Sequence, residues 1–512
     1  MKTQTILKPC TIPNSFHQQT AMRMVLAGSK FAGLPLALVF LTLLTTVSAW
    51  GQVCGGSCPK VCPQPVTNPT ACTLPVGGGN LCPSTQYRFS PDHTGAPKSD
   101  VLSCCAVMNQ CLQLDFSRTS DGLGPSAGPT SSPSVITRTI FAKQEASSPC
   151  GTDVWGLWAY GVGGGSFSWD TITQGTCIRA PIRSSPGYPT QNGSPYIFVG
   201  GEDGNLYAFG YTDGDLGWTY NSGGDLFNSS PTVSEANEVY IVGSLIYKVH
   251  GNTGSLFPNY PIIPNGGFRP ANSAASVALS TCGGQPCLIV SGEYPSMGIG
   301  AVQAYNSVTT AQLWTGRFFD TPITASPVVS ESQGLVYVQG AGSLEAVDLA
   351  TGVYNWLASF PVTNASGLGS PAYDDSNKYV VVSANALDCG TAGHPSQTFC
   401  VGPFGLLAVY DGTRDTGGTL VCMSGGYSGP LFTNSSPTVS NGVIYVGTDD
   451  GYVLAYDETS CTKGALNLIW TSPQMTLSGA PDPVSSPPVV SFNRIHVVTQ
   501  SGTLYVYGLP GY

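Results

Sequence analysis

A phrase that recurs along the chain constrains the fold more than any other feature. Its clearest copy, residues 435–457, reads SSPTVSNGVIYVGTDDGYVLAYD. This copy holds two short apolar strands, 443–447 and 452–457, joined by an Asp450-Gly451 turn. Such a turn suits a tight hairpin, because Gly and Asp accept a positive φ. A self-similar unit of roughly 45–50 residues with several short strands is typical of a β-propeller.

The other copies are located by their opening dipeptide. Each opening precedes an apolar strand, a turn and a second strand, and in five copies a strand that bears a Trp follows; the openings are Ser132-Pro133, Ser185-Pro186, Ser230-Pro231, Ala274-Ala275 in place of Ser-Pro, Ser326-Pro327, Ser370-Pro371, Ser436-Pro437 and Ser486-Pro487. The sequence therefore predicts an all-β fold, an eight-bladed β-propeller of four-stranded antiparallel blades over residues 86–512. Seven blades are the alternative if the segment from Trp155 to Trp169 is not a regular blade.

The last copy lacks its outer strand. It has strands at 494–499 and 503–507, and then the sequence stops. Residues 86–95 and 112–116 precede the first copy, and we expect them to supply the missing strand. A ring closed by strands from both ends removes the exposed sheet edges that promote aggregation.

The composition favours turns and excludes two classes of partner. Charged residues make up only 9% of the 512 residues, alongside 64 Gly and 40 Pro, which indicates many turns rather than long helices. The formal net charge is −10 and the pI is near 4.8. This acidity argues against nucleic acid or an anionic membrane surface as a partner.

Residues 22–49 are typical of a secretory signal. Arg23 and Lys30 supply the positive flank, residues 31–47 the apolar stretch, and a small-residue exit leads to Ala49. We expect cleavage after Ala49, which makes residues 1–49 an N-terminal extension and signal peptide.

Two alternatives concern this segment. Met22 or Met24 is a candidate for the true start, and the apolar run approaches the length of an uncleaved membrane anchor. Pro35 and the small-residue exit favour cleavage. We therefore predict a secreted, extracellular protein with no membrane span after cleavage.

The cysteines agree with export. Of 17 cysteines only Cys10 precedes the signal, and the even remainder is typical of disulfides in an oxidising compartment. One group crowds the first stretch after the signal: Cys54, Cys58, Cys62, Cys72, Cys82, Cys104, Cys105 and Cys111. The others suggest four local disulfides: Cys282 with Cys287, Cys389 with Cys400, Cys150 with Cys177, and Cys422 with Cys461. Residues 50–85 form a Cys/Pro/Gly-rich leader, for which zinc at Cys54, Cys58 and Cys62 is the competing interpretation.

Sequons and one insertion mark surface loops. Asn-x-Ser sequons at Asn192, Asn228, Asn364 and Asn434 are glycosylation candidates. Asn228 and Asn434 directly precede Ser-Ser-Pro, where hydrogen bonding at a turn explains them equally well. The longest insertion, residues 385–405, holds Cys389 and Cys400 and is expected to be a disulfide-closed loop. Loops of that size on a rigid ring often carry binding specificity.

The repeated phrase, from Ser-Pro to the final Trp, resembles the pyrroloquinoline quinone (PQQ)-like repeat of quinoprotein alcohol dehydrogenases and of the bacterial outer-membrane assembly lipoprotein of the same fold. Residues 87–95 resemble the closing strand that precedes these repeats. The resemblance, which extends to WD40/YVTN-like propellers, implies that one set of Trp residues packs between neighbouring blades: Trp169, Trp218, Trp314, Trp356 and Trp470.

The resemblance implies a quinone cofactor less strongly. The dehydrogenases stack a disulfide between adjacent cysteines on the quinone, and Cys104-Cys105 is the matching pair here. It lies before the first full blade, so separate disulfides are the preferred interpretation. The enzymes also hold Ca²⁺ with a Glu, an Asn and an Asp and use a catalytic Asp. Only two acidic pairs are weak metal candidates, Glu202-Asp203 and Asp449-Asp450.

Histidine provides no catalytic constellation. The mature chain has four scattered His residues, and no Cys-x-x-Cys-His haem attachment site is present; the residues are His93, His250, His394 and His496. We predict no cofactor, and a non-catalytic, monomeric binding or scaffold module whose partner is an extracellular protein or a cell-wall glycan. The alternatives are an extracellular PQQ- and Ca²⁺-dependent alcohol or sugar dehydrogenase, and a remnant propeller whose Cys-rich leader carries the function.

Overall fold

The computed structural model describes most of the repeat region. The described residues are 112–118, 131–145, 148–162, 165–189, 194–270, 275–316, 319–361, 365–366, 369–386, 404–424, 431–432 and 435–508. All belong to the unit Val53–Tyr512. Several predictions lie outside these residues: the signal, the leader, Cys104, Cys105, Cys389, Cys400, Asn192, Asn364 and Asn434.

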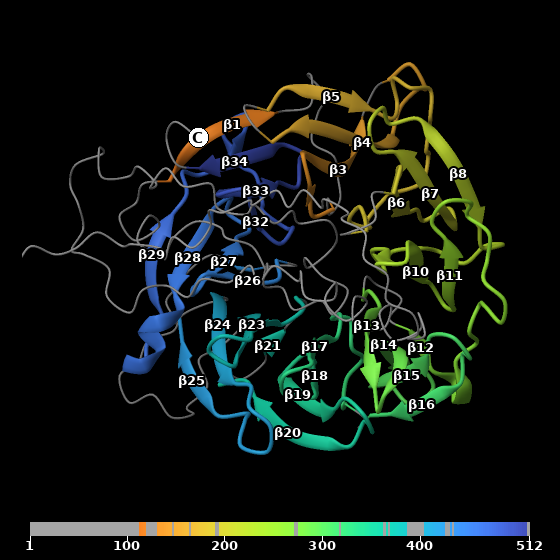
Figure 1. The fold of residues 1–512 in the computed structure, drawn as a ribbon. Coiled ribbons are helices and arrows are strands. Elements are labelled where there is room, and N and C mark those ends of the chain that lie inside the picture. Colours follow the sequence, from red (N-terminus) through yellow and green to blue (C-terminus); the bar gives the residue numbers. More distant parts are fainter. Residues whose placement is uncertain are drawn as a thin grey trace, which may run out of the picture. The chain divides into compact units, whose positions relative to one another are not determined.

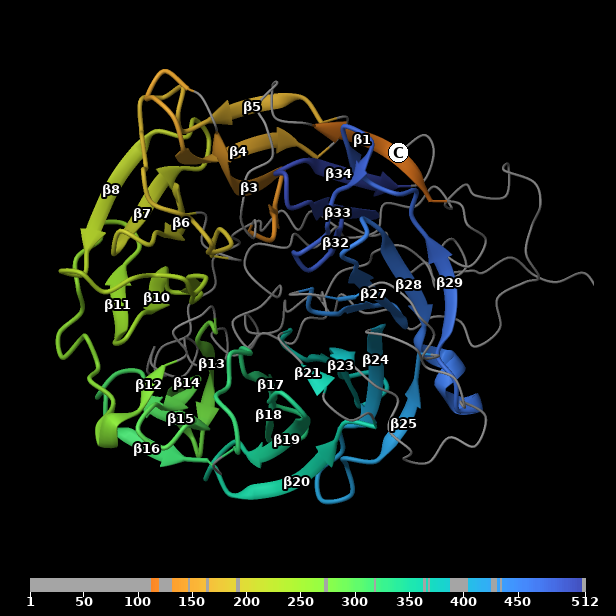
Figure 2. The same cartoon turned by 180° about the vertical axis from the view of Figure 1, so that it is seen from behind.

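Eight antiparallel sheets form the blades of a β-propeller, named A to H here in chain order (Figures 1 and 2). Blade A contains β2 (Ser134–Val135), β3 (Arg138–Glu145), β4 (Val154–Gly161) and β5 (Phe167–Asp170). Because blade A is regular, the seven-blade alternative is wrong. Blade B contains β6 (Tyr196–Gly200), β7 (Asn205–Gly210) and β8 (Leu216–Asn221). Blade C contains β9 (Thr232–Val233), β10 (Glu238–Val242) and β11 (Ile246–His250).

The remaining blades follow in sequence order. Blade D contains β12 (Arg269–Pro270), β13 (Ala278–Cys282), β14 (Gln285–Tyr294), β15 (Ile299–Asn306) and β16 (Gln312–Thr315). Blade E contains β17 (Val328–Ser330), β18 (Leu335–Gln339), β19 (Ser343–Asp348) and β20 (Tyr354–Ser359). Blade F contains β21 (Ala365–Ser366), β22 (Ala372–Asp374), β23 (Tyr379–Ala386), β24 (Phe404–Asp411) and β25 (Leu420–Met423). Blade G contains β26 (Thr438–Ser440), β27 (Val443–Gly447), β28 (Val453–Asp457) and β29 (Asn467–Thr471), and a small hairpin follows it, β30 (Thr476–Leu477) with β31 (Ala480–Pro481).

Blade H closes the ring with strands from both ends of the repeat region. It contains β32 (Val489–Ser491), β33 (Arg494–Val498), β34 (Leu504–Gly508) and β1 (Gln113–Arg118). The N-terminal strand β1 pairs antiparallel with the C-terminal strand β34, so Gln113 faces Gly508 and Arg118 faces Leu504. Of the residues predicted to supply the missing outer strand, 112–116 are confirmed, and 86–95 lie outside the described residues.

Blades B and C depart from four regular strands. In blade B the innermost position is reduced to an isolated bridge between Gly187 and Phe198. In blade C the outermost position is filled by two bridges, Val249 with Leu256 and Ile246 with Ile262. The prolines of segment 256–264 explain the irregularity, because proline cannot donate a ladder hydrogen bond.

The core lies between neighbouring blades. All five residues of β27, Val443–Gly447, are buried. An unbroken apolar, β-branched strand is required there because both of its faces are covered, one by each neighbouring blade. One cluster, for example, joins Ile289 and Val302 of blade D to Val336 and Val347 of blade E.

The repeated serines form a belt of hydrogen bonds between consecutive blades. At each interface from A–B to F–G, a serine N–H donates to the serine hydroxyl of the next blade over 2.8–3.0 Å; in order the residues are Ser132, Ser185, Ser230, Ser276, Ser326, Ser370 and Ser436. Each N–H of the belt is buried, and the neighbouring hydroxyl satisfies it.

Two of the predicted openings are corrected by this belt. Ser276 opens blade D, and not Ala274-Ala275. In blade H the Ser486 hydroxyl donates to Val498 O over 2.9 Å. In other blades the serine directly before the belt serine makes this contact. Pro487 therefore occupies the belt position, and the belt does not continue into blade H, because proline has no N–H and no hydroxyl.

The described residues contain two helical segments, both short 3₁₀ turns. These are η2 (Asn265–Gly267) and η3 (Glu458–Lys463). None of the helical segments in the described ranges has the length and hydropathy needed to cross a membrane.

Candidate functional site

The Trp residues of the outer strands are engaged between blades. The indole Nε1 atoms of Trp169, Trp218, Trp314 and Trp356 each donate over 3.1 Å to a backbone carbonyl in the next blade. Each ring also packs on a glycine of that blade; Gly352, for example, has φ +69° and no room for a Cβ against Trp314. Trp470 lies edge-on to Tyr507, with 5.5 Å between ring centroids. These contacts lie between neighbouring blades.

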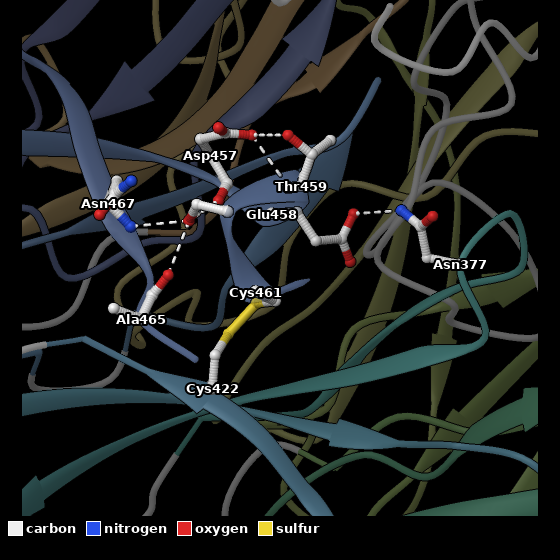
Figure 3. Close-up of a disulfide and its surroundings, with 9 residues drawn as sticks. Asn377, Cys422, Asp457, Glu458, Thr459, Cys461, Ala465 and Asn467 are labelled. Carbon is white, nitrogen blue, oxygen red and sulfur yellow. Dashed lines mark hydrogen bonds between the residues drawn. A yellow bond between two sulfur atoms is a disulfide. The ribbon is translucent and has the colours of Figure 1, made fainter. Parts of the chain in front are cut away.

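The interface between blades F and G uses a disulfide where five other interfaces use a Trp. Strand β25 has no Trp, and its buried Cys422 is bonded to Cys461 on η3 (Figure 3). The segment η3 lies between the third and fourth strands of blade G, the place from which other blades offer a carbonyl to a Trp. A covalent bond thus joins neighbouring blades at the position of the usual aromatic contact.

Two other expected cysteine pairs are bonded within single blades. Cys282 and Cys287, with Cα atoms 5.7 Å apart, join the β13–β14 hairpin of blade D. Cys150 and Cys177, with Cα atoms 5.8 Å apart, join two loops of blade A. The half-buried Asn228 is the one sequon among the described residues, and its Oδ1 is buried.

Glu458 is the most unusual titratable group beside the F–G disulfide. Its side chain is completely buried, and its Oε2 accepts a hydrogen bond from Asn377 Nδ2 over 3.1 Å (Figure 3). The Oε1 atom has no hydrogen-bond partner. Burial, followed by the charge of Asp374, raises the pKa of Glu458 well above its usual value.

The Glu202-Asp203 metal candidate is engaged in protein contacts. Glu202 forms an ion pair with Arg183, which belongs to the connection from blade A. Asp203 accepts hydrogen bonds from the Tyr207 hydroxyl and, over 3.1 Å, from Asn205 N. These contacts hold the turn between β6 and β7.

The Asp449-Asp450 pair lies in the equivalent turn of blade G. Asp450 Oδ1 accepts from Thr448 Oγ1 over 2.6 Å, and Asp449 N donates to Leu431 O over 2.9 Å. Blades A and H lie between the two candidate turns, so the fold does not bring them together. Within the described ranges, no three His, Cys, Asp or Glu side chains are grouped to hold a metal.

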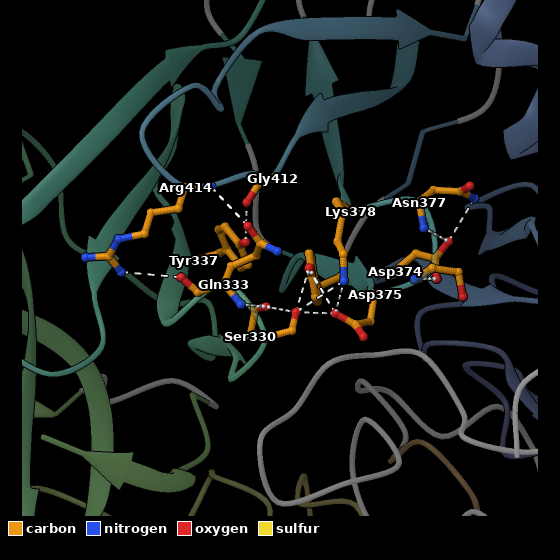
Figure 4. Close-up of polar contacts among 12 residues, drawn as sticks. Ser330, Gln333, Tyr337, Asp374, Asp375, Asn377, Lys378, Gly412 and Arg414 are labelled. Atoms are coloured by element: carbon orange, nitrogen blue, oxygen red, sulfur yellow. Dashed lines mark hydrogen bonds and ion pairs between the residues drawn. The ribbon is translucent and has the colours of Figure 1, made fainter. Parts of the chain in front are cut away.

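A polar network crosses blades E and F (Figure 4). Ser332, in the turn after β17, faces the turn after β22, where Asp375 accepts hydrogen bonds from Ser332 and, over 2.8 Å, from Lys378 Nζ. The Tyr373 hydroxyl lies 3.4 Å from Ser332 Oγ. A Ser–Lys–Tyr–Asp set has the composition of a nucleophilic site.

The electrostatics of this network oppose nucleophile activation. Burial lowers the pKa of Lys378, but its hydrogen bond to Asp375 and the charges of Tyr373, Asp375 and Asp374 together outweigh burial and raise the pKa. Burial raises the pKa of Asp375, but hydrogen bonds from Lys378 and Ser332 outweigh burial and lower it. A protonated lysine and a weakly basic carboxylate are poor bases for the Ser332 proton. The network joins the exposed Ser332 and Asp375 to the buried Tyr373.

The same face is extended by Arg414. Its guanidinium pairs with Asp348 of blade E and donates from Nη1 to Gly334 O over 3.0 Å. Its backbone N donates to Gln333 Oε1 over 3.1 Å. The turns of blades E and F are thereby cross-linked by polar contacts.

The two histidines in the described ranges occupy opposite environments. His250 is exposed and stacks on Phe257 with 3.6 Å between ring centroids. His496 is buried between blades H and A, where its Nδ1 lies 3.0 Å from Thr139 Oγ1. Burial, followed by the charge of Arg494, lowers the pKa of His496 to about 3, so it is neutral in the folded protein.

The described residues do not fit a PQQ–Ca²⁺ site. Such a site needs three oxygen ligands for the ion and an aromatic surface for the quinone, but in the described part of the chain no metal-binding group forms and the outer-strand Trp rings pack between blades. We therefore derive no step through a quinone.

Sequence reasoning missed Glu458, Asn377 and the Ser332 network. The one available signal for Glu458 was its place after the last strand residue of the repeat, Asp457, where a Cys-bearing insertion begins. Asn377 lies in a polar turn like many others, and only the packing of blade F against blade G gives it a role.

Comparison with known proteins gives the fold but no family assignment. No family model matches the sequence, and no curated protein matches it. The quinohemoprotein alcohol dehydrogenase from Comamonas testosteroni superposes with a TM-score of 0.58 and 14% identity, over 84% of this chain and 81% of that chain. BamB from Moraxella catarrhalis gives 0.50 and 15%, over 78% and 98%. A europium-containing methanol dehydrogenase gives 0.52 and 13%, over 83% and 98%. The chain therefore has the fold of PQQ-type propellers.

Proposed function

We propose that the protein is an exported, non-catalytic β-propeller that binds an extracellular protein or a cell-wall glycan. One observation carries the proposal: the aromatic and acidic side chains that a cofactor site would draw on are engaged in holding the blades together. Indole Nε1 atoms donate to neighbouring carbonyls, as in Trp314 to Leu349 O over 3.1 Å. Glu202 pairs with Arg183 and Asp203 accepts from Tyr207. A rigid ring with exposed loops remains, which suits binding.

The three disulfides of the described blades support export. Cys150–Cys177, Cys282–Cys287 and Cys422–Cys461 lie in separate blades or between blades. Structural disulfides persist in oxidising compartments and are rare in the reducing cytosol. We infer secretion from these bonds together with the signal expected over residues 1–49.

A glycan-binding assay tests the preferred function. The purified full chain is incubated with insoluble cell-wall polysaccharides of defined composition and sedimented, with the heat-unfolded chain as the control. Saturable sedimentation of the folded chain alone is expected. If neither a polysaccharide panel nor cross-linking on the surface of the producing cells retains the folded chain, the binding function is wrong.

A dehydrogenase remains the second candidate, because enzymes of that class share the fold over most of their length. The folded chain is titrated with PQQ and Ca²⁺ and followed by quinone absorbance and thermal unfolding, and dye reduction is then assayed with alcohols and sugars. We expect no saturable binding and no dye reduction. Saturable binding with a raised Tm would replace the preferred function with the enzyme.

A further inference from the structure

Glu458 is a buried acid that the contacts described above do not explain. It begins η3 and is completely enclosed between blades F and G (Figure 3). Its Oε2 accepts from Asn377 Nδ2 over 3.1 Å, and its Oε1 has no hydrogen-bond partner. A buried ionised carboxylate costs several kcal/mol unless it is paired with positive charge.

The groups that face Glu458 are acidic or neutral. Asn377 Nδ2 also donates to Asp374 Oδ2 over 2.9 Å, so two carboxylates converge on one amide (Figure 4). Asp457, on the same segment, adds a further negative charge, and Tyr379 of blade F is the other titratable neighbour. The adjacent Lys378 places its Nζ on Asp375, 2.8 Å away, and not on Glu458. The charge of Lys378 reaches Asp374, but no cation of the described residues pairs with Glu458. Two neighbouring acids of which one has no cationic partner do not both ionise readily.

The segment that carries Glu458 also carries the interblade disulfide. Cys461 lies one helical turn further along η3, and both Cys461 and Cys422 are buried. After η3, Leu466 N donates to Met423 O over 3.1 Å and returns the chain to β25. Displacing the start of η3 would therefore expose the sulfur atoms while the chain beyond stayed anchored.

We propose that Asp374, Asn377 and Glu458 form a proton-dependent latch that holds η3 against blade F and shields the Cys422–Cys461 disulfide from reductants. With Glu458 protonated, the carboxyl group is neutral and the two acids need not repel each other. Ionisation places an unpaired charge in the interior, and the charge reaches water only if η3 moves. The latch does not depend on whether the propeller binds a glycan, a protein or a quinone.

The direction of the pH effect follows from the raised pKa of Glu458. The closed latch is fully favoured below the ordinary glutamic acid value of 4.5 and loses stability as the pH rises through the raised folded-state pKa. Between pH 4.5 and the raised pKa of Glu458, the population of the open form rises by up to about tenfold per pH unit. The latch is thus tight in acid and loose in neutral or alkaline solution.

The test measures disulfide reduction by a water-soluble phosphine at pH 5 and pH 8. The phosphine is oxidised to its oxide and the disulfide is reduced to two thiols, with water supplying the oxygen atom and the two protons. Thiols are trapped and each cysteine pair is quantified by mass spectrometry. The Cys282–Cys287 bond, which is also buried, serves as the internal reference. In the natural protein, Cys422–Cys461 reduction relative to this reference should rise steeply with pH.

Two variants and a control decide the outcome. Glu458→Gln keeps a neutral acceptor for Asn377 and should abolish the pH dependence, while Asp374→Asn removes one of the converging charges and should weaken it. Glu331→Gln, an exposed acid of blade E, should leave it unchanged. A relative reduction rate that does not rise with pH in the natural protein would overturn the latch. A pH dependence of the relative reduction rate that persists in Glu458→Gln would also overturn the latch. If that variant does not fold, an undiminished pH dependence in Asp374→Asn would overturn it.

Discussion

Two interfaces of the propeller, F–G and H–A, lack the outer-strand Trp and replace its contact in different ways. Neither β25 nor β1 carries the Trp that docks on the next blade. At F–G the Cys422–Cys461 disulfide takes that place. At H–A, Arg118 Nε of β1 donates over 2.6 Å to Gly165 O of blade A, a turn carbonyl like those that accept from Trp elsewhere. The position of the contact is retained while its chemistry changes.

The serine belt distinguishes the two interfaces further. F–G lies within the belt, where Ser370 N donates to Ser436 Oγ over 2.8 Å. Blade H has Pro487 at that position and cannot contribute. The closing blade relies instead on the ladder between β1 and β34 and on Arg494, which pairs with Asp115 of β1 over 2.7 Å. Closure therefore depends more on charge and on long-range strand pairing than the other interfaces do.

Removal of the interblade disulfide should have the largest effect. The bond closes a loop of 39 residues, whereas Cys282–Cys287 closes one of 5. In the loop-entropy model, the double variant Cys422→Ala/Cys461→Ala loses about 4 kcal/mol and Cys282→Ala/Cys287→Ala about 2 kcal/mol. Urea unfolding of both double variants measures the difference. Equal losses would show that η3 is held mainly by its non-covalent contacts.

The two interfaces should respond to pH in opposite directions. His496 at H–A has a folded-state pKa of about 3, below its ordinary 6.5. Its contribution to the free energy of unfolding is therefore present above pH 6.5 and is lost as the pH falls toward 3. The loss is about 1.4 kcal/mol per pH unit. His496→Asn keeps an acceptor or donor for Thr139 and should remove this slope, which gives the variant a relative gain of about 2–3 kcal/mol at pH 4.5. Thermal unfolding from pH 4 to 8 measures it; an unchanged slope contradicts the assignment.

The closing ion pair should matter more than an exposed one. Only 10% of the Arg494 side chain is exposed, against 41% for Arg414 in its pair with Asp348. Arg494→Leu should cost about 1–3 kcal/mol because it leaves Asp115 unpaired at a partly buried site. Arg414→Leu should cost less than about 1 kcal/mol. Urea unfolding compares the two; a smaller loss for Arg494→Leu would mean that the β1–β34 ladder alone closes the ring.

A belt serine should have the smallest of these effects. Ser326→Ala removes the acceptor of the buried Ser276 N–H and should cost about 1–2 kcal/mol. The exposed Ser376→Ala is the matched control, with an expected change within about 0.5 kcal/mol. Loss of protection of the Ser276 amide in hydrogen exchange localises the effect. A protected amide in Ser326→Ala would show that water replaces the hydroxyl.

The fold was predictable because the same local sequence pattern recurs along the chain. The Ser-Pro openings, the apolar strands and the outer-strand Trp residues each report a local requirement that recurs in successive blades. Even the closure by residues 112–116 followed from a missing strand. The prediction was wrong about register in two blades, where Ser276 and Pro487 occupy the belt position. The belt position moves by two residues in blade D and by one in blade H, and such short shifts in a stretch of small residues leave the local pattern unchanged.

The sequence by itself determined the all-β class, the preferred number of eight blades, the Trp positions and three local cysteine pairs, because these depend on spacings within one repeat or between adjacent repeats. Only the tertiary structure decided which side chains meet across blades. Glu458 and Asn377 are 81 residues apart, and Thr139 and His496 are 357 apart. Such pairs depend on how the edge of one blade packs on the next. Burial then sets their protonation, since an acid or an imidazole among apolar residues acquires a charge only at a cost that no local pattern encodes.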